Sequence, residues 1–159
     1  MDIAAEICTA LADEWLPEIY RVKIRRQRTR SVFIDIPKRE NQSEIQYTLL
    51  GIELKIGRRR IACPDLATAR YMRVFARLGC GEFAIPYDIT KISAAADQLE
   101  TSWQTSLRVL TEKTLGKSAR SISGKRKQLL KAMRFEITST GAGDAMPVFD
   151  RVTKQRLQD

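Results

Sequence analysis

Asp35, Glu53 and Lys55 are the residues whose types and spacing point most directly to chemistry in this sequence. Asp35 precedes Ile36 and Pro37, and one residue separates Glu53 from Lys55. Two carboxylates on neighbouring strands can hold Mg²⁺, which bridges a scissile phosphate and a water molecule. A lysine two residues after a ligand lies on the same strand face and can orient or deprotonate that water. The trio predicts hydrolysis of phosphodiester bonds, with Asp35 and Glu53 as metal ligands and Lys55 as a catalytic residue.

The same residues also allow a purely structural interpretation. Glu53 and Lys55 can form an exposed ionic pair on a strand, and Asp35 can bond nearby backbone at the edge of a loop. Glu44 is an alternative first carboxylate. If one strand runs through this region, Tyr47 shares the face of Glu53 and can stack on a base, although burial of its ring is the more ordinary outcome.

The chain contains no histidine, and this absence excludes whole reaction classes. Ser-His-Asp and Cys-His hydrolysis both need an imidazole. Zinc sites built on imidazole are excluded too, and three scattered cysteines cannot complete a four-thiolate site. The odd number and wide spacing of Cys8, Cys63 and Cys80 also argue against a disulfide framework. Catalysis therefore has to use carboxylates, lysine, tyrosine or a metal held by oxygen ligands.

Hydrophobic periodicity predicts the elements that position these residues. We expect an amphipathic helix over 3–16 that ends or kinks at Pro17, and a short helix or strand over 128–137. The predicted strands cover 20–25, 32–36 and 82–87, one long strand over 44–56 that is broken or bent near Gly51, and a short strand ending at Cys63. A helix over 65–78 has Asp65 as its cap and Gly79 as its stop, and a long helix runs from Thr90 to Gly116. Loops are expected over 37–43 and 138–144.

This order of elements, with Asp35 and then Glu53-Leu54-Lys55 on the strands, resembles the αβββαβ core of the PD-(D/E)XK nuclease superfamily. Within it, residues 3–88 look like archaeal-type Holliday junction resolvases. The resemblance implies a Mg²⁺ cofactor and a homodimer. It also implies that Glu6 or Glu14 on the first helix is an accessory carboxylate.

Positive charge is concentrated in blocks of the sequence. Lysine and arginine exceed aspartate and glutamate by 28 to 19, which gives a net charge of +9. The blocks that we expect to contact nucleic acid are Arg21, Lys23, Arg25, Arg26, Arg28 and Arg30, then Arg58, Arg59 and Arg60, and then Arg70, Arg73 and Arg77 on one side of a helix. Such blocks are typical of phosphate binding, although runs of charge also serve as ordinary solvated surface.

The order of the predicted helices and strands indicates an α/β or α+β domain with a small mixed sheet flanked by helices. We place this core at residues 1–116, including the long helix, and expect a basic, serine-rich linker and tail with at most short secondary structure at 117–159. No run of apolar residues is long enough to span a membrane, and the acidic start lacks the basic region of a signal peptide, so we expect a cytoplasmic protein.

Three classes of function remain open from the sequence. The first is a Mg²⁺-dependent DNA endonuclease or resolvase-like enzyme that uses Asp35, Glu53 and Lys55. The second is a non-catalytic RNA- or DNA-binding protein, including a ribosome-associated one. The third is an adaptor for an acidic protein or membrane surface. DNA is expected over RNA as the nucleic-acid partner.

Overall fold

The structure, a computed structural model, describes residues 2–36 and 42–142. Helices and two small antiparallel sheets make up the fold, which has a long helix near its C-terminal end and confirms the predicted α/β or α+β class. The elements in chain order are α1 (Ile3–Leu11), η1 (Ala12–Glu14), α2 (Leu16–Ile19), η2 (Tyr20–Ile24), β1 (Thr29–Phe33), β2 (Ser43–Thr48), β3 (Gly51–Ile56), β4 (Arg59–Cys63), α3 (Leu66–Leu78), β5 (Glu82–Pro86), η3 (Ile89–Lys91), α4 (Ile92–Lys113) and α5 (Ala119–Thr140).

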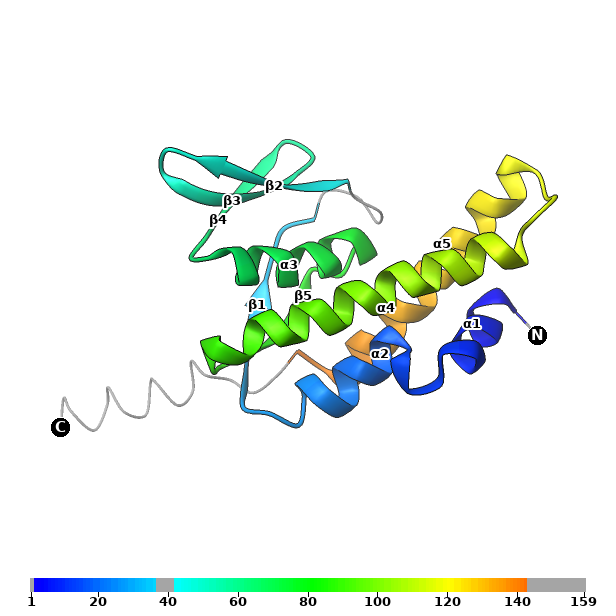
Figure 1. Cartoon of the computed structure of the whole chain (residues 1–159), viewed down its shortest axis with the longest axis horizontal. Coiled ribbons are helices and arrows are strands. Elements are labelled where there is room, and N and C mark those ends of the chain that lie inside the picture. Colours follow the sequence, from blue (N-terminus) through cyan, green and yellow to red (C-terminus); the bar gives the residue numbers. More distant parts are fainter. Residues whose placement is uncertain (1, 37–41, 143–159) are drawn as a thin grey trace.

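The elements are arranged in successive layers. The sheet β2-β3-β4 lies over one side of α3, and α4 packs against another side of the same helix (Figure 1). Helices α1 and α2 contact both α4 and α5, and α5 runs back from the end of α4 in the opposite direction. Helix α3 therefore separates the three-stranded sheet from the helical part of the fold.

The three-stranded sheet is a meander whose first turn lies at Leu49 and Leu50. Strands β2 and β3 pair antiparallel, with Ile45 opposite Leu54 and Tyr47 opposite Ile52. The sequence predicted one long strand broken or bent near Gly51. The position of the break is correct, but the chain reverses direction there and forms two antiparallel strands. Gly51 has a φ of 124°, a conformation that favours glycine, and this explains why the turn falls here.

Strands β1 and β5 form a separate two-stranded antiparallel sheet. The single mixed sheet expected from the sequence is thus two sheets, and every strand pair among the described residues is antiparallel. Strand β5 is confirmed close to its predicted bounds. Residues 37–41 of the predicted loop and the tail from 143 onwards lie outside the described residues.

The segment Tyr20–Ile24 is helical, so the prediction of a strand over 20–25 is wrong. It is one π-helical turn that continues α2, and the amide of Arg25 donates to the carbonyl of Tyr20 over 2.9 Å. Tyr20 and Ile24 are buried while Val22 is only half-buried. Burial therefore recurs every four residues, together with Leu16, and the alternation of apolar and charged residues was misleading.

The first predicted helix is interrupted at Ala12. Helix α1 ends at Leu11, and Ala12 has a φ of 53°, which is uncommon for a residue with a side chain. Pro17 lies in the first turn of α2, where its missing amide proton costs no hydrogen bond. Proline therefore begins a second helix here and does not end the first.

Helix α3 matches its prediction closely. Asp65 caps it by accepting a hydrogen bond from the amide of Thr68 over 2.7 Å, and Gly79 ends it with a φ of 78°. The buried face of this helix contributes Tyr71 and Phe75 to an aromatic cluster. The ring of Phe75 stacks on that of Phe83 from β5, with 4.1 Å between the ring centroids.

Helix α5 replaces most of the predicted linker. Residues 119–140 form one continuous helix, so the expectation of at most short secondary structure after Gly116 is wrong for this segment, and the predicted loop at 138–140 is helical too. Ser118 caps the helix by accepting a hydrogen bond from the amide of Ser121 over 3.2 Å. The buried side chains of this helix, which attach it to the core, are Leu129, Leu130, Met133 and Ile137.

Candidate functional site

The carboxylate of Asp35 forms an ion pair with Arg59, the first residue of β4. Both side chains are more than half exposed. Arg59 lies opposite Ile56 in the β3–β4 pair, so it starts from the buried face of the sheet. Asp35 thus has a cationic partner on that side.

Glu53 and Lys55 lie on the other face of the same sheet. The side chains of a strand alternate between faces, and Leu54 and Ile56 are fully buried on the side of α3. The structure therefore brings Glu53 and Lys55 together on the outer face, while the partner of Asp35 belongs to the inner face. Tyr47 lies opposite Ile52 and so does not share the face of Glu53.

The outer face of the sheet carries a second carboxylate at Glu44, which lies directly opposite Lys55. One oxygen of Glu53 is buried and has no hydrogen-bond partner among the described residues. The alternative ligand Glu44 is thus the carboxylate that shares a face with Glu53. Nowhere in the described part of the chain do three residues of the types His, Cys, Asp and Glu form a group able to hold a metal ion, so Mg²⁺ stays a prediction.

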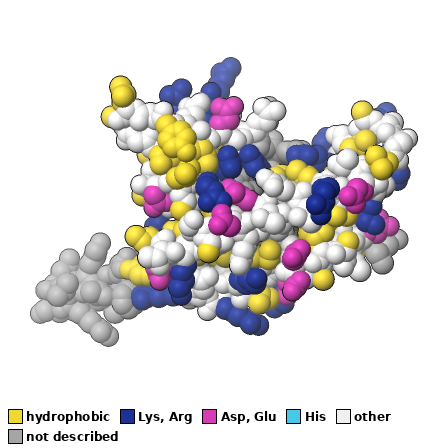
Figure 2. All heavy atoms as spheres, in the orientation of Figure 1, with side chains coloured by type: hydrophobic (Ala, Val, Ile, Leu, Met, Phe, Trp, Pro, Cys, Tyr) yellow, Lys and Arg dark blue, Asp and Glu magenta, His cyan; other side chains and the backbone are white. Residues whose placement is uncertain are grey.

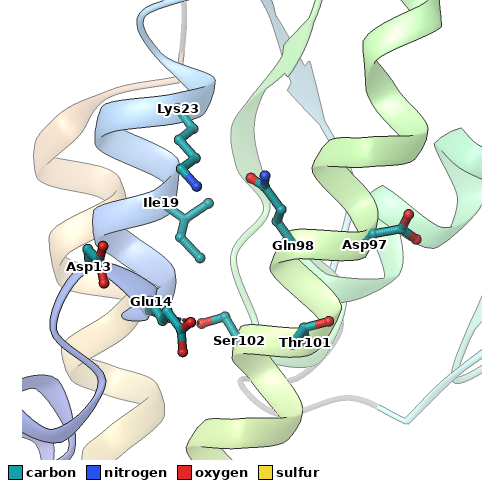
Figure 3. A pocket seen from close by; sticks show the side chains of 8 residues that line it. All are labelled: Asp13, Glu14, Ile19, Lys23, Asp97, Gln98, Thr101 and Ser102. Atoms are coloured by element: carbon teal, nitrogen blue, oxygen red, sulfur yellow. Dashed lines mark hydrogen bonds between the residues drawn. The ribbon is translucent and has the colours of Figure 1, made fainter.

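The two accessory carboxylates proposed from the resemblance lie in the helical part of the fold. Glu6 is on α1, which packs on α4 and α5, and Glu14 is in η1. Glu14 lines a cavity of about 300 Å³ between the first helical segments and α4 (Figure 3). The cavity is lined by Asp13, Glu14, Ile19, Lys23, Asp97, Gln98, Thr101 and Ser102. Three carboxylates against one lysine make it unfavourable for an anionic ligand.

The six cations from Arg21 to Arg30 differ in their surroundings. Some contact neighbouring side chains, and others extend into solvent. Arg21 pairs with Glu18, with 2.5 Å between Nη2 and Oε1. The guanidinium of Arg28 lies 4.7 Å from the centre of the Tyr87 ring. Arg25 is half-buried and donates to Thr29 Oγ1 over 3.1 Å. The exposed remainder of this predicted site is Lys23, Arg26 and Arg30.

The arginines of the β3–β4 turn are divided between the two faces of the sheet. Arg60 lies opposite Lys55 on the outer face, and Arg59 holds Asp35. Gly57 opens the turn with a φ of 60°, and Arg58 and Arg60 are exposed. Arg58 and Arg60 are therefore accessible to an anion.

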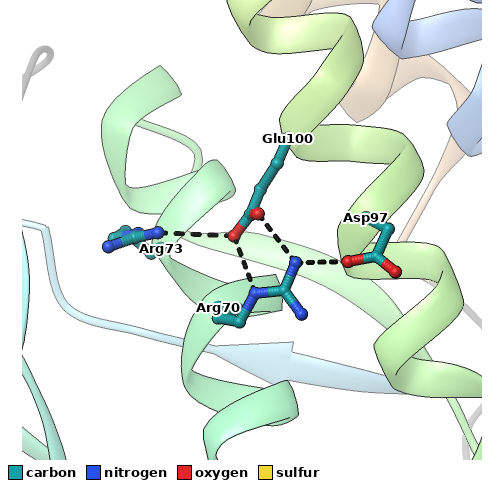
Figure 4. Close-up of polar contacts among 4 residues, drawn as sticks. All are labelled: Arg70, Arg73, Asp97 and Glu100. Atoms are coloured by element: carbon teal, nitrogen blue, oxygen red, sulfur yellow. Dashed lines mark hydrogen bonds and ion pairs between the residues drawn. The ribbon is translucent and has the colours of Figure 1, made fainter.

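Two of the three predicted arginines of α3, Arg70 and Arg73, pair with carboxylates of α4 and so do not form a free stripe. Arg70 donates to both oxygens of Glu100, with Nε 3.2 Å from Oε1 and Nη2 2.8 Å from Oε2, and it also pairs with Asp97 (Figure 4). These hydrogen bonds raise the pKa of Arg70 above its usual range. Arg73 reaches the same Glu100 with a separation of 3.4 Å. Arg70 is thus a structural link between α3 and α4.

A group of exposed cations lies where α4 ends and α5 begins. The sequence indicated a basic linker here and did not predict the helix that starts at Ala119. From Lys113 to Phe135 the chain has eight lysines and arginines and no carboxylate. Its exposed members, which we call the hairpin cations, are Lys113, Lys117, Arg120, Lys127 and Lys131. The recurrence of Ile122, Leu129, Met133 and Ile137 at helical spacing was the signal that could have revealed them.

Two cysteine thiols are unsuited to nucleophilic chemistry. Burial raises the pKa of Cys63 and Cys80, so both thiols stay protonated near neutral pH. Each is a free thiol, and both are buried. They act as small core residues.

Lysine and arginine side chains are spread over the face of the molecule drawn in Figure 2, with carboxylates among them. Hydrophobic side chains gather on the same face over the lobe formed by the three-stranded sheet. This agrees with the exposure of Tyr47, Leu49 and Leu50 around the β2–β3 turn. Within residues 2–36 and 42–142, no helix combines the length and the apolar character needed to cross a membrane.

Comparison of the chain with protein-family models, with curated proteins and with solved structures finds no match. The resemblance of residues 3–88 to nucleases therefore remains a prediction from the sequence. Inferences about its function therefore rest on its α+β fold and on the placement of its charged side chains.

Proposed function

We propose that the protein binds nucleic acid, with duplex DNA as the favoured form, and that it does so without cleaving it. The observation that carries this proposal is the set of hairpin cations, because they are exposed and the sequence has no carboxylate between Lys113 and Phe135. Cations that neutralise backbone phosphates release condensed counterions, which supplies most of the affinity for nucleic acid.

The secondary structure supports the same proposal. Arg120, Lys127 and Lys131 are spaced by seven and four residues, so they lie along one side of α5. Cations held on a helix lose less conformational freedom on binding than cations on a flexible linker. An α-helix also fits the major groove of B-DNA, about 12 Å wide, whereas the major groove of duplex RNA is too deep and narrow for it.

The arrangement of the predicted catalytic residues favours binding over cleavage. Asp35 is paired with Arg59, whose position in β4 belongs to the inner face of the sheet, and Glu53 with Lys55 lies on the outer face. A metal that needs both carboxylates cannot be held without rearrangement of this pair.

The test is the salt dependence of DNA binding, measured by fluorescence anisotropy with a labelled duplex. If all five hairpin cations contact phosphates, the slope of log K against log salt is about −4 to −5. The double variant Lys127→Gln/Lys131→Gln removes two of them and should reduce that slope by about 2.

A matched control is Arg21→Gln/Lys91→Gln, which removes the same net charge. Arg21 pairs with Glu18. Hydrogen bonds from Thr90 lower the pKa of Asp88, and the charge of nearby Lys91 adds to this effect. We expect the control to leave the slope unchanged. Equal effects of the two double variants would mean that net charge alone governs binding and would contradict the proposal, as would tighter binding of duplex RNA than of duplex DNA.

A further inference from the structure

The carboxylates of α4 neutralise the positive charges of three arginines on α3 to different degrees. Arg70, Arg73 and Arg77 follow one another at intervals of three and four residues, so they lie on one side of the helix. The carboxylates of α4 that reach them are Asp97 and Glu100. Arg70 contacts both carboxylates and occupies both oxygens of Glu100. The two carboxylates therefore have little remaining capacity to pair with Arg73 and Arg77.

Arg73 is only partly paired. Its single ion pair joins Nη2 to Oε1 of Glu100 over 3.4 Å, an oxygen that Arg70 Nε also approaches. Its Nε is buried and has no hydrogen-bond partner among the described residues. A buried donor without an acceptor is costly, and native structures rarely keep one without a reason.

Arg77 has no ion pair and no side-chain hydrogen bond to any residue that the structure describes, although it is half-buried. Its pKa is lowered, first by burial and then by the positive charge of Arg73, and the charge of Glu100 only partly offsets this. At the carbonyl end of α3, the carbonyl of Leu78 accepts from Arg134 over 2.8 Å. Two neighbouring guanidinium groups therefore repel each other in a partly desolvated position.

We infer that Arg73 and Arg77 form a binding site for one phosphoryl group, carried either by a small phosphorylated molecule or by a nucleic-acid backbone. Guanidinium groups bind phosphate oxygens through paired N–H donors. A phosphoryl group presents acceptor oxygens in several directions, so it can serve two arginines on successive helical turns. It also adds negative charge to that of Glu100, which is shared among Arg70, Arg73 and Arg77. The site lies on α3 and is separate from the hairpin cations.

Inorganic phosphate is the probe for the test, added to the full-length protein at constant ionic strength against sodium chloride. We expect a rise in Tm with phosphate and a saturable isotherm by calorimetry. Arg77→Gln should weaken binding by about tenfold or more, since it removes a charge-assisted contact. Arg77→Lys should recover only part of it, because lysine cannot bind in a bidentate manner. Arg108→Gln, at an exposed position of α4, is the matched control and should bind as the wild type does.

A second readout separates a binding role from a structural one. Without phosphate, Arg77→Gln should unfold at the same temperature as the wild type or higher, because it removes an unpaired cation next to Arg73. A lower Tm without phosphate would assign Arg77 a structural role and overturn the inference. Equal phosphate affinity of the Arg77→Gln variant and the wild type would overturn it too.

The source of the phosphoryl group is decided by competition with a short oligonucleotide. If the oligonucleotide displaces phosphate, and Arg77→Gln weakens both, the ligand is a backbone phosphate. If phosphate binds without competition, the ligand is a small phosphorylated molecule. Phosphate binding by the Lys127→Gln/Lys131→Gln variant should be unchanged in either case, so failure of the DNA-binding proposal leaves this inference testable.

Discussion

The hydroxyl group of Tyr20 accepts a hydrogen bond from the backbone amide of Ala84, with 2.8 Å between the two atoms. The same hydroxyl donates to the carbonyl of Gly141 over 2.6 Å. Ala84 is in the middle of β5, and Gly141 directly follows α5. One fully buried side chain from the π-helical turn thus joins the two-stranded sheet to the end of the last helix.

Replacement of Tyr20 by phenylalanine should lower the free energy of unfolding by about 1–3 kcal/mol, because the buried amide of Ala84 and the carbonyl of Gly141 lose their partner. Urea denaturation measures the change. Tyr87→Phe is the control, since Tyr87 is 44% exposed and should cost less than about 0.5 kcal/mol. Equal costs for the two variants would show that the Tyr20 hydroxyl adds no stability.

Stability should fall at alkaline pH because burial raises the pKa of Tyr20 to about 12, from its ordinary value of about 10. Below pH 10 the hydroxyl is protonated in both the folded and the unfolded chain. Between pH 10 and 12 the unfolded chain loses this proton first, so the unfolded state is favoured as pH rises. The loss amounts to about 2–3 kcal/mol for this residue. The free energy of unfolding, measured across this pH range, should fall more steeply for the wild type than for Tyr20→Phe. Parallel curves would contradict this assignment to Tyr20.

Helix α3 was predictable because all of its determinants are local. Asp65 and Gly79 mark its ends, and the apolar positions between them follow one period. The segment Tyr20–Ile24 was not predictable in the same way, because alternating apolar and charged residues are also compatible with one turn of a helix. Its conformation is decided by tertiary contacts, including the bond from Tyr20 to Ala84.

In the candidate site, too, the sequence predicts the features that depend on local spacing and not those that depend on tertiary packing. The shared face of Glu53 and Lys55 follows from their spacing alone, and the sequence predicted it correctly. The pairing of Asp35 with Arg59 could not be read from the sequence, because it depends on the tertiary packing that brings the residues after β1 close to the start of β4. The compensation of Arg70 by Glu100 likewise depends on the packing of α3 on α4.

Gly124 should accept alanine with a gain in stability. It lies in the middle of α5, and a Cβ atom placed there meets nothing within 4 Å. Alanine has the higher helix propensity, so Gly124→Ala should raise the free energy of unfolding by about 0.5–1 kcal/mol. Gly81→Ala is the contrasting variant, because its Cβ would lie 2.9 Å from the carbonyl oxygen of Ile34. Thermal unfolding should show opposite signs, and a loss of stability in Gly124→Ala would argue against a helix at this position.

Glu100 should contribute more to stability than Asp97, although both pair with Arg70. The side chain of Glu100 is 19% exposed and that of Asp97 is 63% exposed. Glu100→Gln should therefore cost about 1–3 kcal/mol, and Asp97→Asn less than about 1 kcal/mol, in denaturant unfolding. The loss of Glu100 should also strengthen phosphate binding, because Arg73 then has no competing carboxylate. Equal costs for the two variants would mean that burial does not govern these pairs.

Incubation with branched and linear DNA, with and without Mg²⁺, tests the predicted nuclease activity. We expect binding without metal-dependent cleavage, because Asp35 is held by Arg59 while Glu53 and Lys55 lie on the opposite face of the sheet. Cleavage that is lost in both Asp35→Asn and Glu53→Gln would contradict this expectation and support the metal site first derived from the sequence. Cleavage that is lost in Glu44→Gln and Glu53→Gln but kept in Asp35→Asn would place the metal on the outer face, where both of these carboxylates flank Lys55.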